Sequence, residues 1–499
     1  MAKNVTLVFV HGWSVTNLNT YGQLPVRLRE QGKQAGINII VKDIYLGQYI
    51  SFHDEVKVQD ISRAFNSAIK ETLVDLVKNK ERFVAITHST GGPVVRDWSE
   101  RYKAEWPTLP MSHLIMLAPA NFGSTLAQLG KSKVSRLKSW FEGVEPGQGV
   151  LDWLELGSNE SWNLNMGWIN KDAATISESS FFPFVLIGQA IDRNFYDNLN
   201  SYTGEMGSDG VVRCSGANLN ASYISITQPA PGSNDAVKVE TKVAPRTAFR
   251  IVENSSHSGT KMGILAGEKA AVNDPTGNDT VNAILNCIKV GTKSQYDALC
   301  DTFVAETAQV QQKELIEPIK KGIFSLKDRY FFHDRFSMVT FKLVDSEGYP
   351  VRDFDLLFTT GPNNNPNLLP EGFFVDRQRN SKNGETITYY INYDIMNSSP
   401  AVINDKKEEI RAKNVGIDNL GLTIVPRPAD GFVHYAPFTL NADNDFFDKV
   451  ITPNATTLIE IRLQRLVDKN VFLLKGPITE MPTSKTKFSD IKTSGENVK

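Results

Sequence analysis

The sequence predicts an α/β fold, a doubly wound parallel sheet, joined to a second and mostly β domain of sandwich-like type. Two patterns lead to this prediction. Over the first ~300 residues, short apolar runs alternate with segments of helical period, which is typical of a buried parallel sheet. After about residue 320, short β-like runs are separated by proline, asparagine and glycine, as in all-β domains. With 499 residues, the chain is also too long for one ordinary core.

The first half carries six candidate strands. The apolar runs predict strands over residues 5–10, 37–41, 83–86, 113–117, 184–187 and 249–252. Residues 60–77 follow a helical period with Asp60 as the cap, and a further helix is expected around residues 94–102. We therefore expect a catalytic domain over residues 1–300.

In the second half of the chain, the sequence pattern changes from alternating strands and helices to short β-like runs. Short β-like runs are found at residues 336–344, 354–359, 386–393, 421–425, 432–438 and 457–466. A helical segment over residues 301–321 is expected to connect the two domains. The β-rich domain would then span residues 322–499, ending in a polar, lysine-rich tail from about residue 482.

Composition excludes several classes of protein. An apolar fraction of 41% and a charged fraction of 22% are typical of a soluble globular protein. The net charge of -2 argues against general affinity for nucleic acid. The three cysteines, Cys214, Cys287 and Cys300, form no disulfide framework and are expected to be reduced and buried. No segment has the ~20 apolar residues of a membrane span, and the N-terminal run is too short for a Sec signal peptide.

The residues around Ser89 form the most informative motif. A β-rich run over residues 83–86 stops at this serine, and a helix is expected directly afterwards. This arrangement indicates a nucleophile elbow, the strand-to-helix turn that exposes a serine hydroxyl in α/β-hydrolases. Gly91 and Pro93 fit the pattern, whereas Thr87 stands where the usual motif has its first glycine. Ser89 is therefore the candidate nucleophile.

A serine nucleophile needs a neighbouring base, which on this fold is a histidine after a later strand. The seven histidines are His11, His53, His88, His113, His257, His333 and His434. Of these, His257 follows the predicted strand over residues 249–252, which is the position that the mechanism requires. We expect His257 to be the general base; the alternative is a surface-loop histidine.

The triad acid is harder to choose. Asp209 lies in a Ser-Asp-Gly-Val-Val segment, a turn followed by an apolar run that would hold a carboxylate rigidly. Asp192 and Asp197 follow the strand over residues 184–187, and Asp192 remains the reserve candidate. We prefer Asp209, which would accept the imidazole Nδ1–H and stabilise the imidazolium.

Two backbone amides would form the oxyanion hole, one after the nucleophile and one from an early loop. Thr90 meets the first condition, and Trp13, at the end of the first strand, meets the second. No metal-ligand pattern and no phosphate loop is found, so neither a metal nor a cofactor is expected.

A long insertion, about residues 124–180, separates two predicted strands. It holds four of the seven tryptophans, namely Trp140, Trp153, Trp162 and Trp168. One interpretation is a helical cap packed on the sheet; the other is a lipid-facing lid, because tryptophan favours the boundary of water and acyl chains. The basic residues that precede this cluster, Lys131, Lys133, Arg136 and Lys138, would attract anionic head groups or form a solvated face.

Two segments resemble the PlaB family of bacterial phospholipases A. They are residues 10–15 (VHGWSV) and 87–98 (THSTGGPVVRDW), and the spacing to Asp209 and His257 agrees too. The threonine at Thr87 is itself what this family shows. The resemblance implies phospholipase A and lysophospholipase A activity, peripheral association with a membrane (the bacterial outer membrane), a C-terminal domain needed for activity, and a homo-oligomer.

The leading hypothesis is therefore a serine hydrolase that cleaves acyl esters of glycerophospholipids and lysophospholipids through an acyl-enzyme. Two alternatives stay open. One is a thioesterase or general carboxylesterase on the same triad, and the other is a membrane-binding module on a catalytically dead scaffold.

Overall fold

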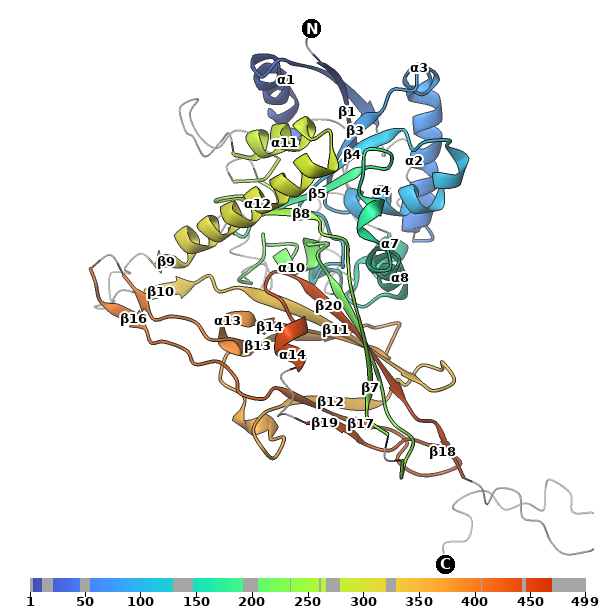
Figure 1. Cartoon of the computed structure of the whole chain (residues 1–499), viewed down its shortest axis with the longest axis vertical. Coiled ribbons are helices and arrows are strands. Elements are labelled where there is room, and N and C mark those ends of the chain that lie inside the picture. Colours follow the sequence, from blue (N-terminus) through green and yellow to red (C-terminus); the bar gives the residue numbers. More distant parts are fainter. Residues whose placement is uncertain are drawn as a thin grey trace, which may run out of the picture.

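The computed structural model describes residues 3–10, 21–44, 54–128, 147–191, 205–233, 235–259, 262–265, 279–319, 329–404, 406–441 and 446–468. The chain forms an α/β unit and a β-rich unit, stacked along the long axis of the molecule (Figure 1). The predicted fold class is confirmed.

The α/β unit is built on a six-stranded sheet in the order β2-β1-β3-β4-β5-β8, and every neighbouring pair is parallel. The strands are β1 (Lys3–Val10), β2 (Ile37–Ile44), β3 (Phe83–His88), β4 (Met111–Leu117), β5 (Phe182–Ile187) and β8 (Ala248–Ile251). All six predicted strands are present. Strands β3 and β5 are buried along their whole length because helices cover both faces, which explains their continuous apolar sequences.

Helices flank this sheet, with α1 against α11 on one side and α2 against α4 on the other (Figure 1). The bounds are α1 (Leu24–Gln34), α2 (Val58–Thr72), α3 (Val74–Lys78), α4 (Gly91–Arg101), α11 (Asp279–Lys289) and α12 (Lys293–Glu314). The helix predicted over residues 60–77 is in fact two helices, which meet at Leu73. Asp60 lies inside the first turn, and its carboxylate caps the helix by accepting from the Lys57 backbone amide at 3.1 Å.

The β-rich unit is a sandwich of two sheets. The larger sheet has the order β13-β14-β11-β20-β6-β7, and the smaller has the order β12-β17-β19. The bounds are β6 (Ser222–Thr227), β7 (Lys238–Val243), β11 (Phe336–Asp345), β12 (Phe354–Thr359), β13 (Phe374–Arg379), β14 (Thr386–Asn392), β17 (Gly421–Pro426), β19 (Phe438–Leu440) and β20 (Thr456–Leu463). Apolar side chains of both sheets form one core between them, including Phe341 of β11, Phe358 of β12 and Ile424 of β17.

The remaining elements are short. Paired strands are β9 (Ile316–Ile319) with β10 (Arg329–Phe332), β15 (Val402–Ile403) with β16 (Glu409–Arg411), and β18 (Val433–His434) with β21 (Leu466–Val467). The further α-helices are α8 (Asn159–Ile169), with 11 residues, and the shorter α7 (Gln148–Leu154), α10 (Cys214–Ala217), α13 (Tyr393–Met396) and α14 (Phe446–Val450).

Strands β6 and β7 come from the first half of the chain but belong to the second sheet. Strand β6 pairs in parallel with β20, and β7 pairs with β6 and forms the edge of the sheet. No strand was predicted over these residues. The helix expected over residues 301–321 is α12, which begins at Lys293 and lies along β8, where the Thr307 hydroxyl accepts from the Ile251 amide at 3.0 Å. The two units are therefore interleaved along the chain.

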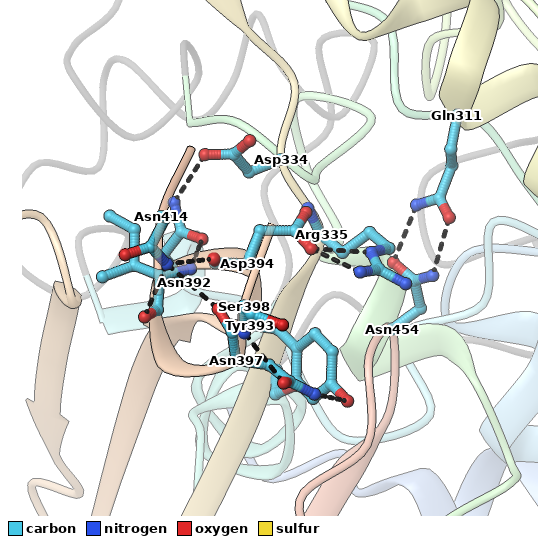
Figure 2. A network of polar contacts seen from close by, with 12 residues as sticks. Gln311, Asp334, Arg335, Asn392, Tyr393, Asp394, Asn397, Ser398, Asn414 and Asn454 are labelled. Carbon is cyan, nitrogen blue, oxygen red and sulfur yellow. Dashed lines mark hydrogen bonds and ion pairs between the residues drawn. The ribbon is translucent and has the colours of Figure 1, made fainter. Parts of the chain in front are cut away.

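Polar contacts join the two units at the end of α12 (Figure 2). Gln311 of α12 and Asn454 exchange two amide hydrogen bonds, of 3.1 and 3.2 Å. The carbonyl of Asn454 also accepts from the Asn218 side chain at 2.8 Å. Beside them, Arg335 donates its Nε to Asp394 at 2.9 Å (Figure 2). Since α/β-unit residues contact the start of β20 directly, the sandwich is fixed relative to the sheet above it.

Three of the four tryptophans of the insertion lie in the core. Trp153 of α7, and Trp162 and Trp168 of α8, are 3%, 5% and 6% exposed. The helical-cap interpretation expected this burial, whereas a lipid-facing lid would have exposed these rings. Trp140 and the four basic residues Lys131, Lys133, Arg136 and Lys138 lie outside the described residues.

None of the helices in the described ranges is long and apolar enough to cross a membrane. The three cysteines are buried free thiols, as predicted. Burial raises the pKa of each thiol, that of Cys300 to about 11.

Candidate active site

Ser89 stands at a sharp turn between β3 and α4. Its φ of 53° lies in the left-handed region, which residues other than glycine rarely adopt. The surrounding structure must therefore stabilise this conformation. The backbone amide of Ser89 donates to Leu117 at 3.0 Å. A Cβ at Gly92 would come within 2.7 Å of the Pro119 Cβ, so close packing of α4 requires glycine there. The side chain of Ser89 is partly exposed. This is the geometry of a nucleophile elbow.

Thr87 occupies the position of the missing glycine. Its side chain is fully buried, and within the described ranges its hydroxyl has no hydrogen-bond partner. The elbow therefore tolerates a threonine two residues before Ser89.

His257 and Asp209 are hydrogen-bonded. His257 Nδ1 lies 2.8 Å from Asp209 Oδ2, and both side chains are buried. The other carboxylate oxygen, Oδ1, accepts from the backbone amides of Val211 and Val212 at 3.0 and 2.8 Å. Because a carboxylate accepts, the tautomer assigned from this bond carries its proton on Nδ1 and leaves Nε2 free to act as a base.

His88 brings the end of β3 next to the histidine loop. Its ring centroid lies 4.6 Å from that of His257, and its Nε2 donates to the His257 carbonyl at 3.1 Å. Since Ser89 is the next residue along the chain, the candidate nucleophile and the candidate base meet at the same edge of the sheet. The sequence shows His88 directly before Ser89, but no motif there indicates this contact with the His257 loop.

The loop that carries His257 is held from two further directions. A Cβ at Gly188, at the end of β5, would lie 1.8 Å from the Ser255 carbonyl oxygen, so the two backbones are in close contact. From the end of α12, Glu314 accepts from the Asn254 amide and from the Gln189 side chain. Burial raises the pKa of Glu314 above its ordinary value.

The turn that carries Asp209 is also held from two sides. On the side of the histidine loop, the His257 amide donates to the Asp209 carbonyl at 2.9 Å. On the side of the sandwich, the Tyr390 hydroxyl of β14 lies 2.9 Å from the Met206 carbonyl and 3.2 Å from that of Gly207.

Arg213 follows this turn and is 3% exposed. It makes two bonds to Glu205, of 2.8 and 2.7 Å, and one to Asp376 of β13, of 2.6 Å. Burial alone would lower the pKa of the guanidinium, but the Glu205 and Asp376 carboxylates outweigh burial and raise it. Neither Arg213 nor Tyr390 has a motif that sequence analysis could have found.

The structure describes only part of the predicted oxyanion hole. Thr90 directly precedes the first residue of α4, at the N-terminus, where backbone amides have no acceptor within the helix. Trp13 lies outside the described residues, as do Asp192 and Asp197. No group of three His, Cys, Asp or Glu side chains in the described part of the chain is placed to hold a metal ion.

Comparison with known proteins gives a clear structural match. The phospholipase PlaB from Legionella pneumophila is 39% identical, covers 97% of this chain and 98% of its own, and superposes with a TM-score of 0.82. The same protein in complex with thio-NAD is 38% identical over the same coverage, with a TM-score of 0.82. No protein-family model and no curated protein sequence matches.

Proposed function

Because this chain belongs to the PlaB family of phospholipases, we propose that it hydrolyses acyl esters of glycerophospholipids and lysophospholipids. The observation that carries the proposal is the 2.8 Å bond between His257 and Asp209, beside a Ser89 with a φ of 53°. Together they provide a nucleophile, a base with its free nitrogen, and an acid that orients the base.

In the proposed reaction, the Ser89 hydroxyl attacks the ester carbonyl carbon while His257 Nε2 takes its proton. Asp209 stabilises the imidazolium that forms. When the tetrahedral intermediate collapses, the carbon–oxygen bond to the glycerol breaks, and His257 gives its proton to the leaving alkoxide. The acyl group remains on Ser89 as an ester.

Water then completes the reaction. His257 takes a proton from water, the hydroxide attacks the acyl carbon, and the fatty acid leaves as Ser89 recovers its proton. The Thr90 and Trp13 amides are the proposed oxyanion donors in both halves, and removing such a donor typically costs about a hundredfold or more in rate. The reaction balances with water alone, and no step passes through a metal or a dinucleotide.

The family resemblance supports a wider setting for this reaction. We propose that the chain acts at a membrane surface as a peripheral protein, with the bacterial outer membrane as the compartment, and that it self-associates. Flotation with phospholipid vesicles tests membrane binding, and light scattering tests self-association, each separately from catalysis. Absence of vesicle binding would contradict association with the membrane, and the mass of a monomer would contradict self-association.

The test of the function is a substrate panel with a Ser89→Ala variant. The wild-type chain should release fatty acid from diacyl and lysophospholipid vesicles, and the variant should not. Undiminished release by the variant would refute the role of Ser89. Short water-soluble esters or thioesters cleaved in preference to vesicles would favour the esterase or thioesterase alternative. No hydrolysis of any substrate would favour a dead scaffold.

A further inference from the structure

The turn that carries Asp209 combines hydrogen bonds of its own with contacts from outside the turn. Glycines on either side of it have positive φ values, 69° for Gly207 and 96° for Gly210. Bonds within the turn fix its local shape: Asp209 Oδ1 accepts from the Val211 and Val212 amides, and the Ser208 hydroxyl donates to the Val212 carbonyl at 3.2 Å. Bonds within the turn do not set where it lies relative to the sheet, so contacts from outside must place Asp209 opposite His257.

Tyr390 supplies the first of these contacts. Its side chain is fully buried, its ring stacks on Phe336 at 5.1 Å, and its hydroxyl reaches two successive carbonyls, those of Met206 and Gly207. A Cβ at Gly207 would lie 2.5 Å from the Tyr390 hydroxyl, so this side chain is in close contact with the turn. The bond therefore fixes the backbone two residues before Asp209.

Arg213 supplies the second contact, on the other side of Asp209. Its guanidinium is bound by Glu205 and Asp376 and lies 4.0 Å from the Tyr390 ring. Asp376 is itself held by Gln378, whose Nε2 donates to Oδ2 at 3.0 Å. The two ends of the turn are thus joined to β13 and β14 of the sandwich.

We propose that Tyr390 and the Arg213–Asp376 pair are positioning residues, which hold the turn over residues 205–213 so that the Asp209 carboxylate meets His257. The proposal rests on the triad under "Proposed function". It gives the sandwich a chemical task, because β13 and β14 contact the turn of the triad acid and no residue of the sandwich itself needs to enter the reaction.

Stability alone explains this cluster poorly. Burying charges costs free energy, and well-packed apolar residues of similar volume are often at least as stabilising. In the described part of the chain, the buried Arg213 Nη1 also has no hydrogen-bond partner, although Nε and Nη2 are paired. An unpaired buried donor costs free energy, so this cluster does not maximise stability.

The test compares two neighbouring tyrosines of β14. Tyr390→Phe removes the hydroxyl that reaches the turn and keeps the ring. The matched control is Tyr389→Phe, which removes a hydroxyl bonded to Leu356 inside the sandwich at 2.8 Å. Asp376→Asn provides a second, independent variant. All are assayed as full-length proteins on a chromogenic ester and on phospholipid vesicles, with thermal unfolding measured in parallel.

Tyr390→Phe and Asp376→Asn should lower kcat, by up to about a hundredfold, and leave KM unchanged, since misplacing a triad group by about 1 Å can cost that much. Tyr389→Phe should keep the wild-type kcat. In an Asp209→Asn background, Tyr390→Phe should cause no further loss, because the bond that it positions is already gone.

Two results would overturn the proposal: wild-type kcat in both Tyr390→Phe and Asp376→Asn, or the same fractional loss of kcat in the Asp209→Asn background as in wild type. Failure of the triad itself is distinguishable, because Asp209→Asn would then retain full activity.

Discussion

His257 contacts Asp209 twice, through its ring Nδ1 at 2.8 Å and through its backbone amide at 2.9 Å. The first bond orients the imidazole, and the second fixes the loop that carries it. Displacing the Asp209 turn would therefore move both the ring and its backbone. Asp209 therefore fixes both the orientation of the His257 ring and the position of the loop that carries it.

Asp209→Asn is expected to lower kcat by about 10⁴ without loss of the fold, since an amide in place of the carboxylate favours the wrong imidazole tautomer. Activity on a soluble ester and thermal unfolding check the two parts of this prediction. Asp192→Asn, at the reserve position, is the matched control and should behave as wild type. The choice of acid is wrong if the Asp192 variant is inactive and the Asp209 variant is not.

Gly188→Ala should destabilise the protein by about 1–3 kcal/mol or more, because the new Cβ would overlap the Ser255 carbonyl oxygen. Gly167→Ala is a matched substitution inside α8, where a Cβ meets nothing within 4 Å. It should be neutral or stabilise by about 0.5–1 kcal/mol. Urea unfolding of the two variants measures the difference, and equal midpoints would contradict the close contact between β5 and the histidine loop.

The buried carboxyl group of Glu314 should make the free energy of unfolding depend on pH. Burial raises its pKa in the folded state, so the folded chain holds this proton more tightly than the unfolded chain. Stability contributed by the protonated form is therefore lost as the pH rises from about 4.5, the ordinary value, through the raised pKa. In Glu314→Gln, the free energy of unfolding should fall less over this window.

Urea unfolding over that pH range tests the Glu314 prediction. Glu371→Gln removes an exposed carboxylate and serves as the control, with the wild-type slope expected. A Glu314→Gln slope identical to that of the wild type would show that this carboxyl does not contribute.

Because β6 and β7 belong to the sheet of the sandwich, removing the second half of the chain should leave this sheet incomplete. A fragment of residues 1–320 keeps β6 and β7 but loses β20, so it exposes a strand edge and the apolar side chains of Ile224 and Ile226. We expect it to aggregate, and co-expression with residues 321–499 to restore solubility. Size-exclusion chromatography decides between these outcomes. A soluble fragment with cooperative unfolding would contradict this interdependence of the two units.

Much of the α/β unit could be predicted because its signals are local. Strand β3 begins with an apolar run and ends at His88, directly before Ser89, and β8 ends shortly before His257, so strand order alone places both at one edge of the sheet. The turn around Asp209 was also recognisable as a turn. Topology alone left Asp209 and Asp192 both open as the acid, and the 2.8 Å contact between His257 Nδ1 and Asp209 Oδ2 supports Asp209.

The rest depends on contacts between distant parts of the chain. Strand β7 reads KVETKV and is exposed throughout, so its composition gives little sign of a sheet edge. The sequence is compatible both with an exposed lid and with a buried cap at Trp153, Trp162 and Trp168, so it could not decide between the two. Tyr390 lies among the β residues of a predicted strand, and only the folded structure shows that its hydroxyl meets the Asp209 turn.

The role of Ser89 in phospholipid hydrolysis is tested by trapping the nucleophile and following hydrolysis in the same sample. The protein is treated with an active-site fluorophosphonate, and the adduct is mapped by mass spectrometry while fatty-acid release from phospholipid vesicles is measured. We expect one adduct per chain, on Ser89, with activity lost in proportion to labelling. Labelling at another residue, or full phospholipid hydrolysis after complete labelling of Ser89, would contradict this role.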